Sequence, residues 1–207
     1  MLKKVRISVL VSGSGTNLQA MIDAVNSGII KSGEICAVIS SKEDAYALER
    51  AKQNGIACYC VPKKKYSDQM VFEDKLNDIL KKEDAELIVL AGFMCVLSAG
   101  FVKQYKDRII NVHPSLIPSF CGDGFYGLRV HKAALDYGVK VSGATVHYVN
   151  EIIDGGKIIL QKAVNVRKGD TPEILQKRIM EQAEWKILPK ACEMICVRII
   201  RERKLKK

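Results

Sequence analysis

Apolar residues along this chain follow two alternating patterns. Short, nearly continuous apolar runs rich in Val and Ile predict buried strands, and the longer segments between them carry apolar residues at helical spacing. We predict strands at 5–11, 34–39, 57–61, 85–92, 108–110, 143–149 and 158–166. We predict helices at 18–25, 45–54, 69–82, 98–105 and 128–137, and a last one that starts after Thr171, passes Trp185 and kinks or breaks at Pro189.

Strand alternating with helix predicts an α/β fold of the doubly wound, Rossmann-like kind, with a mostly parallel sheet and helices on both faces. The length of 207 residues suits a single domain over 1–207. Ligands of such sheets bind beyond the carboxyl ends of the strands. We therefore expect the turn after the first strand, Met94 and Cys95 after the fourth, and Asn111 and His113 after the fifth to converge on one edge.

The segment Asn111–Pro118 holds the clearest candidate chemistry. A carboxamide and an imidazole stand two residues apart where a strand opens into a loop that contains two prolines, and that spacing puts both side chains on one face of a strand. Asn can hold an oxyanion and His can deliver a proton near neutral pH, which is what formyl or acyl transfer needs. The alternative is a buried Asn and His that satisfy loop carbonyls.

A glycine-rich turn, Ser12–Asn17, joins the first strand to the first helix. Backbone N–H groups at such a turn, together with the helix dipole, form an anion site, although many tight turns of this kind bind nothing. A dinucleotide site needs a third glycine where Leu18 stands and an acid at the end of the second strand, where Ser40 and Ser41 stand. No Gly-Lys-Ser/Thr follows the turn either. A small phosphorylated metabolite fits better than a nucleotide cofactor.

Asp154 is the third catalytic candidate, in a loop between the last two strands. A carboxylate there would stabilise the imidazolium of His113 if the two lay side by side, but Asp-Gly is also a common turn dipeptide. Of the other histidines, we expect His147, on a strand, to be structural or to support the site from behind. We expect His131, in an amphipathic helix, to be a surface or helix-packing residue, while its place just after the loop Ser119–Gly127 leaves a substrate role open.

Charge, cysteines and hydropathy narrow the class of protein. The net charge is +10, and half of it lies in a basic tail, residues 198–207, which we expect to be a solvated helix end or a frayed terminus. Aromatic residues are few and not interleaved with bases, which argues against nucleic acid. No apolar run approaches the length of a membrane span and no signal peptide precedes the first strand. We expect a cytoplasmic protein whose seven cysteines are reduced, mostly buried and without zinc-ligand spacing.

Five motifs together resemble the folate-dependent formyltransferases, and most closely the glycinamide ribonucleotide formyltransferases of purine synthesis. The resemblance covers nearly the whole chain and rests on residues 12–19, 90–94, 111–118, 143–147 and 154–156. The Asn-x-His-Pro-Ser-Leu-x-Pro stretch is shared by all formyltransferases of this group. The N-terminal turn is more particular to the enzymes that act on glycinamide ribonucleotide.

The resemblance implies a reaction. The amine of glycinamide ribonucleotide attacks the formyl carbon of the co-substrate 10-formyltetrahydrofolate, and no metal is needed. Asn111 and protonated His113 stabilise the oxyanion, and His113 protonates the leaving tetrahydrofolate. Asp154 raises the pKa of His113 and helps to move protons.

The resemblance also implies two sets of binding residues. The substrate-binding set is Gly15, Thr16 and Asn17 at the phosphate, and Glu184 at the ribonucleotide. The folate-binding set is Gln69, Met94, Cys95, Val96, Leu97, Asn111 and Asn150, with the loop 149–154 closing over the pterin.

Several positions depart from the family pattern. Cys95 and Gln69 stand where folate-contacting arginines are usual, and the basic run Lys63–Lys65 offers a substitute grip on the glutamate tail. The loop Ser119–Gly127 is longer than usual and carries three glycines, which predicts mobility, and Arg129 replaces a common His.

Two kinds of rival function stay open. Methionyl-tRNA formyltransferase needs an extra C-terminal domain and formyltetrahydrofolate hydrolase an extra N-terminal one, so length favours the glycinamide ribonucleotide enzyme. A non-catalytic phosphometabolite- or RNA-binding domain would use the glycine-rich turn and the basic tail, but it leaves Asn111, His113 and Asp154 unexplained. We expect small-molecule substrates, no nucleic acid or membrane partner, and a monomer or weak homodimer.

Overall fold

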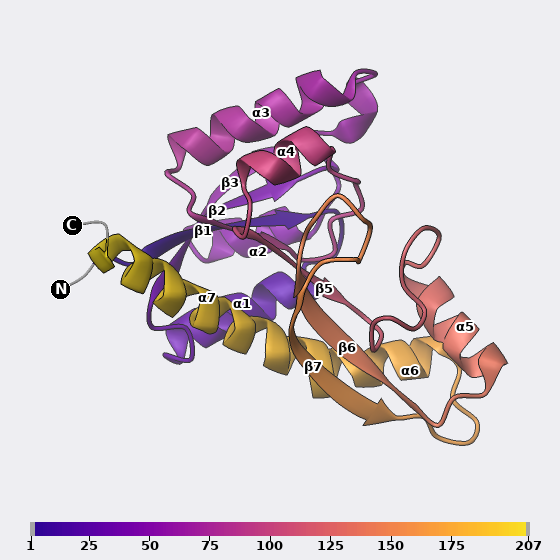
Figure 1. The fold of residues 1–207 in the computed structure, drawn as a ribbon. Helices are drawn as coiled ribbons and strands as arrows, with labels where there is room; N and C mark the ends of the chain where they lie inside the picture. Colours follow the sequence, from indigo (N-terminus) through magenta and orange to yellow (C-terminus); the bar gives the residue numbers. More distant parts are fainter. Residues whose placement is uncertain (1–2, 206–207) are drawn as a thin grey trace.

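The structure is a computed structural model that describes residues 3–205, and it contains a seven-stranded sheet (Figure 1). The strands are β1 (Val5–Val11), β2 (Gly33–Ser40), β3 (Ala57–Cys60), β4 (Leu87–Leu90), β5 (Ile109–His113), β6 (Val141–Tyr148) and β7 (Ile158–Asn165). Their order across the sheet is β3-β2-β1-β4-β5-β6-β7. β1 to β5 pair in parallel, whereas β6 and β7 are antiparallel additions. The predicted doubly wound, mostly parallel α/β fold is confirmed.

Helices lie on both faces of this sheet. They are α1 (Thr16–Asn26), α2 (Ala47–Gln53), α3 (Gln69–Lys82), α4 (Ala99–Gln104), α5 (Leu128–Tyr137), α6 (Pro172–Ile179) and α7 (Trp185–Leu205), with a 3-10 turn at Lys63–Lys65 and a π-helical turn at Met180–Glu184. α3 and α4 cover one face and α1 and α7 the other, while α5 lies beside α6 (Figure 1). Within residues 3–205, no helix combines the length and the apolar surface that crossing a membrane needs.

Two apolar cores, one on each face, explain the sequence pattern. α3 presents Phe72, Leu76 and Leu80 at helical spacing to one face, and α7 presents Leu188 and Ile195 to the other. Full burial of each such side chain contributes about 1.5–3 kcal/mol. The parallel strands lie between the cores and are covered on both sides, which is why they appear in the sequence as continuous apolar runs.

The start of the last helical segment follows its sequence signals, but its irregularity lies elsewhere than predicted. Thr171 caps α6 by accepting a hydrogen bond from Ile174 N, and Pro172 opens the helix. A break at Pro189 was wrong, because α7 continues through it. The irregularity is the π-helical turn Met180–Glu184.

The described part of the basic tail is a helix end on which Arg201 and Lys204 are exposed, as expected, but the alternative of a frayed terminus was wrong because other residues of the tail are docked. α7 extends to residue 205. Arg203 pairs with Glu86 just before β4, and Arg198 donates a hydrogen bond of 2.9 Å to the hydroxyl of Tyr148. The guanidinium groups find acceptors just before β4 and at the end of β6, which the charges in the sequence alone did not reveal. The last two residues of the tail lie outside the described part.

The seven cysteines are free thiols. Cys192 and Cys196 are buried on α7, but the other five are partly or fully exposed, so the expectation of mostly buried thiols was wrong. Cys60 shows the reason: it lies on β3, which is an edge strand with only one neighbour.

Candidate active site

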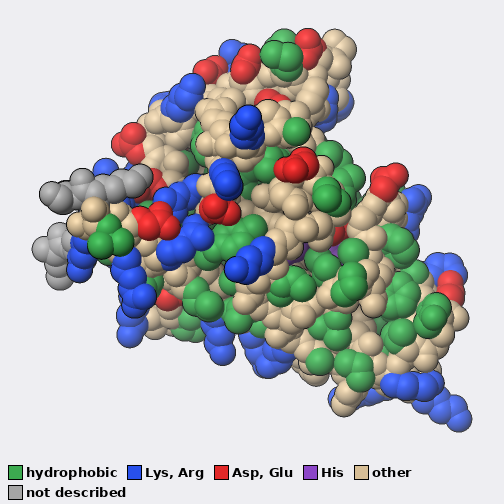
Figure 2. All heavy atoms as spheres, viewed as in Figure 1, with side chains coloured by type: hydrophobic (Ala, Val, Ile, Leu, Met, Phe, Trp, Pro, Cys, Tyr) green, Lys and Arg blue, Asp and Glu red, His purple; other side chains and the backbone are tan. Residues whose placement is uncertain are grey.

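A cavity of about 360 Å³ opens at the carboxyl ends of β4 and β5 and connects the two faces of the sheet. Phe93–Leu97, which leads from β4 to α4, and Val149–Ile153, which follows β6, line one end. Asn17 of α1, Met180 and Glu184 line the other end, on the opposite face. In the space-filling view, histidine is seen only as a small area at the bottom of a hollow between hydrophobic side chains (Figure 2).

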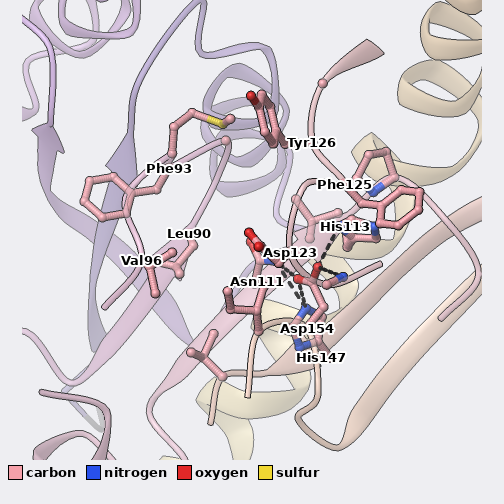
Figure 3. A pocket seen from close by; sticks show the side chains of 18 of the residues that line it. Leu90, Phe93, Val96, Asn111, His113, Asp123, Phe125, Tyr126, His147 and Asp154 are labelled. Atoms are coloured by element: carbon pink, nitrogen blue, oxygen red, sulfur yellow. Dashed lines mark hydrogen bonds and ion pairs between the residues drawn. The ribbon is translucent and has the colours of Figure 1, made fainter. Parts of the chain in front are cut away.

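The three catalytic candidates meet in this cavity (Figure 3). Asp154 Oδ2 lies 3.4 Å from His113 Nδ1, and Asp154 Oδ1 lies 3.4 Å from Asn111 Nδ2. His147 joins them, since its Nε2 lies 3.1 Å from Asn111 Nδ2 and 3.6 Å from Asp154 Oδ1. β5 runs through His113, so the Asn–His pair occupies the end of the strand, where the expected loop has not yet begun.

Strand register explains why these residues meet. β5 and β6 are antiparallel, and Asn111 stands directly opposite His147. His147 Nδ1 lies 2.8 Å from the carbonyl of Tyr148, which can only accept, so Nδ1 carries the proton and Nε2 accepts from Asn111. His147 therefore orients the Asn111 amide, as expected of a supporting residue.

The loop after β6 brings Asp154 back to the strands. Asp154 has a φ of 56°, a left-handed conformation that Asp tolerates better than most residues. A Cβ on Gly156 would lie 1.6 Å from the carbonyl oxygen of Tyr148, so this position accepts only glycine. The Asp-Gly-Gly sequence is therefore both turn chemistry and the means of placing a carboxylate beside His113.

Burial and the neighbouring acceptors shift the His113 pKa in opposite directions. His113 is 4% exposed, and this burial lowers its pKa below the usual 6.5. Asp154 and the carbonyl of Phe120, 2.8 Å from His113 Nε2, act in the opposite direction and raise that pKa, but burial outweighs them. The predicted effect of Asp154 on the His113 pKa has the right sign, and the larger effect of burial was not part of the prediction.

Asp154 is held in its charged form. Burial raises the pKa of its carboxyl, but the nearby His147 and His113 rings and the N–H of Gly122, 3.0 Å from Oδ2, together lower that pKa below its ordinary value. The loop Ser119–Gly127 thus contacts both members of the pair, through Phe120 and Gly122, and lines the cavity. Its mobility stays a prediction.

Of the four residues predicted to bind the ribonucleotide, two line one end of the cavity. Gly15 precedes α1 with a φ of 73°. Asn17 Nδ2 donates a hydrogen bond of 2.6 Å to Glu184 Oε2. Burial raises the pKa of Glu184 to about 7, while the bond from Asn17 opposes the increase. Asn17 and Glu184 line the cavity, whereas Gly15 and Thr16 do not, and Thr16 lines a second cavity of about 540 Å³.

The predicted folate residues divide into two groups. Met94, Cys95, Val96, Leu97, Asn111 and Asn150 line the cavity. Gln69 does not, because its amide donates hydrogen bonds to the Val96 carbonyl at 3.1 Å and to Glu73 Oε1 at 2.6 Å. A Gln69 contact with a bound ligand would therefore run through the Val96 backbone, which its amide holds and which lines the cavity.

The basic run Lys63–Lys65 also lies outside the cavity lining. Lys65 and Lys64 pair with Glu43, at 2.6 and 3.8 Å, and both are largely exposed. Their charges are thus partly neutralised on the surface, and the suggested grip on a glutamate tail stays a prediction.

His131 is the functional candidate that sequence reasoning misplaced. It is fully buried, it lines the cavity, and neither ring nitrogen has a hydrogen-bond partner among the described residues. Of the two expected positions, the surface was wrong, and the ring lies on the packed side of α5. The available signal was its place between Val130 and Ala134, which are both buried on the inward side of α5.

Within the described chain, no group of three or more His, Cys, Asp or Glu side chains has the arrangement of a metal site.

Comparison with known proteins agrees with this site. Residues 5–192 match the formyl transferase family. The chain belongs to the formyl transferase family. Among its formyl transferase relatives, phosphoribosylglycinamide formyltransferase of Haemophilus influenzae is 42% identical over 184 residues, which cover 89% of this chain and 84% of that protein. Within the family, the chain therefore belongs with the phosphoribosylglycinamide formyltransferases.

A longer relative and two solved structures extend the comparison of this formyl transferase. The trifunctional purine biosynthetic protein adenosine-3 of Homo sapiens is 40% identical over 193 residues, which are 93% of this chain but only 18% of that protein. Glycinamide ribonucleotide transformylase 1 from Symbiobacterium toebii has a TM-score of 0.87 at 41% identity and covers 93% of this chain and 88% of its own. Phosphoribosylglycinamide formyltransferase from Coxiella burnetii has a TM-score of 0.83 at 40% identity, with 94% and 86% covered.

Proposed function

We propose that this chain transfers the formyl group of 10-formyltetrahydrofolate to the amine of glycinamide ribonucleotide, giving N-formylglycinamide ribonucleotide and tetrahydrofolate in purine biosynthesis. One observation carries the proposal: Asn111, His113 and Asp154 meet in a single cavity, in a chain of the phosphoribosylglycinamide formyltransferase group. A cavity open to both faces of the sheet suits a reaction between two different substrates.

The two ends of the cavity suit the two substrates. The backbone N–H groups at the start of α1, after Gly15, would hold the phosphate of the ribonucleotide, with Asn17 and Glu184 beside its glycinamide part. The segments 93–97 and 149–154 would hold the pterin at the opposite end, where the lining is mostly apolar. The reacting atoms then meet near Asn111 and His113.

Asn111 has a donor available for the oxyanion. As the amine attacks the formyl carbon, the carbonyl oxygen gains an electron pair. One hydrogen of Asn111 Nδ2 is bound to His147, and the other makes only the long 3.4 Å contact with Asp154, so it is the second that the oxyanion recruits.

His113 is arranged as the proton donor. Its two ring nitrogens face the Phe120 carbonyl and the Asp154 carboxylate, which are both acceptors, so the geometry suits the doubly protonated ring. The developing oxyanion adds negative charge and raises the His113 pKa at the step where N10 of the folate must be protonated. Transfer from Nε2 requires that the bound folate displace the Phe120 carbonyl.

The Asp154→Asn variant tests the charge on this pair. Because the Asp154 carboxylate raises the His113 pKa, its replacement by a neutral amide lowers that pKa further. Less imidazolium is then present at neutral pH, so we expect kcat to fall by roughly tenfold for each unit of the shift. The limb of the rate profile that requires the acid moves to lower pH, and the variant regains part of the loss, relative to the unaltered protein, in mildly acidic buffer.

The measurement is an NMR titration of His113 together with kcat for both proteins at each pH. The paired comparison is needed because acid also protonates the attacking amine. A His113 titration that does not change in Asp154→Asn would reduce Asp154 to a turn residue.

A spectroscopic assay tests the function itself. The protein is mixed with glycinamide ribonucleotide and a 10-formyl folate, and release of the deformylated folate is followed. We expect release that depends on the ribonucleotide. Release at the same rate without the ribonucleotide would indicate a hydrolase, and no release at all would refute the proposal.

The RNA-binding alternative is testable without disturbing the fold. Deleting the tail is unsuitable, because Arg198 and Arg203 attach it to Tyr148 and Glu86 of the sheet. Arg201 and Lys204 are exposed on the same turns, and Gln at both positions removes charge from the surface alone. We expect unchanged turnover and no salt-dependent RNA affinity in either protein. A strongly salt-dependent RNA affinity that falls in the double variant would favour the RNA-binding function.

We also propose that residues 1–207 act as a single formyltransferase domain with small-molecule partners only, as a monomer or weak homodimer in the cytoplasm, without a metal. The continuous seven-stranded sheet, on which both ends of the cavity are built, supports the single domain.

A further inference from the structure

His131 is a buried titratable residue that the reaction described above does not use. It is fully buried on α5, and both of its ring nitrogens lack a hydrogen-bond partner among residues 3–205. An unsatisfied buried polar group costs about 1–3 kcal/mol. An imidazole kept in this condition while it lines a cavity points to a partner that arrives with a ligand.

The position of His131 selects the ligand. α5 packs against α6 (Figure 1), and the helical segment that continues from α6 contributes Gln176, Met180 and Glu184 to the same cavity. Glu184 is bound to Asn17 at the start of α1. His131 thus lies among the elements that build the end of the cavity assigned to the ribonucleotide.

The two imidazoles of the cavity have different neighbours, although burial lowers the pKa of both. His113 faces two acceptors, which suits a proton donor. Burial, and then the charge of His113, lower the pKa of His131 to about 4, so its ring is neutral at pH 7 and offers a lone pair. A pair of titratable groups in different environments is the usual way in which one site supplies both an acid and a base.

We propose that His131 is the base of the formyl transfer: a neutral ring nitrogen of His131 accepts the proton that the glycinamide amine loses as it attacks. The inference rests on the proposed function and completes its proton transfers. The lone pair of the amine forms the new C–N bond, and the carbonyl π pair moves to oxygen. The proton leaves the nitrogen for His131, whose ring becomes an imidazolium.

The second half of the reaction restores the balance. The oxygen pair re-forms the carbonyl, the bond from carbon to N10 breaks, and its electron pair stays on N10, which takes a proton from His113. His131 has gained one proton and His113 has lost one, so a single transfer between them through solvent resets the site. The substrate phosphate adds negative charge at this end of the cavity and raises the proton affinity of His131 while the substrate is bound.

The test uses His131→Ala, with Lys132→Ala as the matched control on the exposed side of the same helix, where Lys132 pairs only with Asp136. We expect kcat of His131→Ala to fall by roughly 10²–10³, with little change in either KM, because the base acts in the transition state. Added imidazole enters the space that the side chain leaves, and turnover of His131→Ala rises with its concentration. The unaltered protein and Lys132→Ala do not respond to imidazole.

Two results would overturn the inference. Turnover of His131→Ala close to that of the unaltered protein would show that no base is needed there, and a loss that imidazole does not restore would assign His131 to helix packing. If His131→Ala fails to fold, His131→Gln fills the space and accepts a hydrogen bond but not a proton, so near-normal turnover of that variant also excludes the base. Failure of the proposed function is distinct, since the unaltered protein would then release no folate in response to the ribonucleotide.

Discussion

Replacing His113 with alanine is expected to lower kcat by roughly 10²–10⁴ while both substrates still bind. The imidazole contributes mainly in the transition state, where the oxyanion forms and N10 takes a proton. Its ground-state contacts, to Phe120 and Asp154, are with the protein itself. Turnover is measured under saturation with both substrates, and binding of each is measured separately by calorimetry.

A His113→Asn variant serves as a second replacement of similar polarity, because it keeps hydrogen-bonding capacity but cannot deliver a proton near neutral pH. Both variants should lose turnover to a similar extent. Near-normal turnover in either one would contradict the mechanism, because His113 is the ring whose two nitrogens face the Phe120 carbonyl and the Asp154 carboxylate.

Replacing Gly15 with valine is expected to weaken ribonucleotide binding by more than about 30-fold, the equivalent of roughly 2 kcal/mol, and to leave folate binding nearly unchanged. Gly15 has a φ of +73°, and a Cβ there would lie 2.6 Å from Ala47 Cβ and 2.8 Å from Ala47 Cα. The turn must therefore move away from α2, and the N–H groups that would face the phosphate move with it. The folate end of the cavity is built from other segments.

Gly28→Val provides the matched control. Gly28 also has a left-handed φ, +76°, and it lies just beyond the opposite end of α1, where the only atom that its Cβ would approach is Lys31 Cε at 4.0 Å. Similar backbone strain there should reduce stability without a selective loss of ribonucleotide binding. Isothermal titration of each ligand against both variants decides the matter. Equal loss of both ligands in Gly15→Val would indicate general misfolding or a misplaced phosphate site.

Much of the fold was available from local sequence signals. The apolar runs located all seven strands, and the cap at Thr171 with Pro172 located the start of α6. The convergence of the β1 turn, the residues after β4, and Asn111 with His113 followed from the rule that parallel strands end at one edge. Local propensity and this rule are properties of short segments, so a single sequence suffices for them.

The remainder depended on contacts between distant segments. His147 came to lie beside Asn111 because β6 runs antiparallel in one particular register, which no local pattern specifies. The helix periodicity placed His131 near the inward side of α5 but could not show that this side borders a cavity. The docking of Arg203 on Glu86 joins residues that are 117 positions apart in the chain.

The pKa of His113 required the burial of the site as well as its charges. Asp154 was identified from the sequence, and its effect on His113 has the predicted sign. The larger, opposing effect is desolvation, which depends on the walls that Phe120, the loop around it and β6 build over the strand end. The free protein therefore holds less imidazolium than the charges alone would suggest.

The central claim is that this cavity passes a formyl group from folate to the glycinamide amine. The most direct measurement follows an isotope label in the formyl carbon of 10-formyltetrahydrofolate through a reaction with glycinamide ribonucleotide, with products separated and analysed by mass. We predict that the label appears in N-formylglycinamide ribonucleotide in an amount equal to the tetrahydrofolate formed, and that His113→Ala forms both far more slowly. Label recovered as free formate, or absent from the ribonucleotide, would contradict the claim.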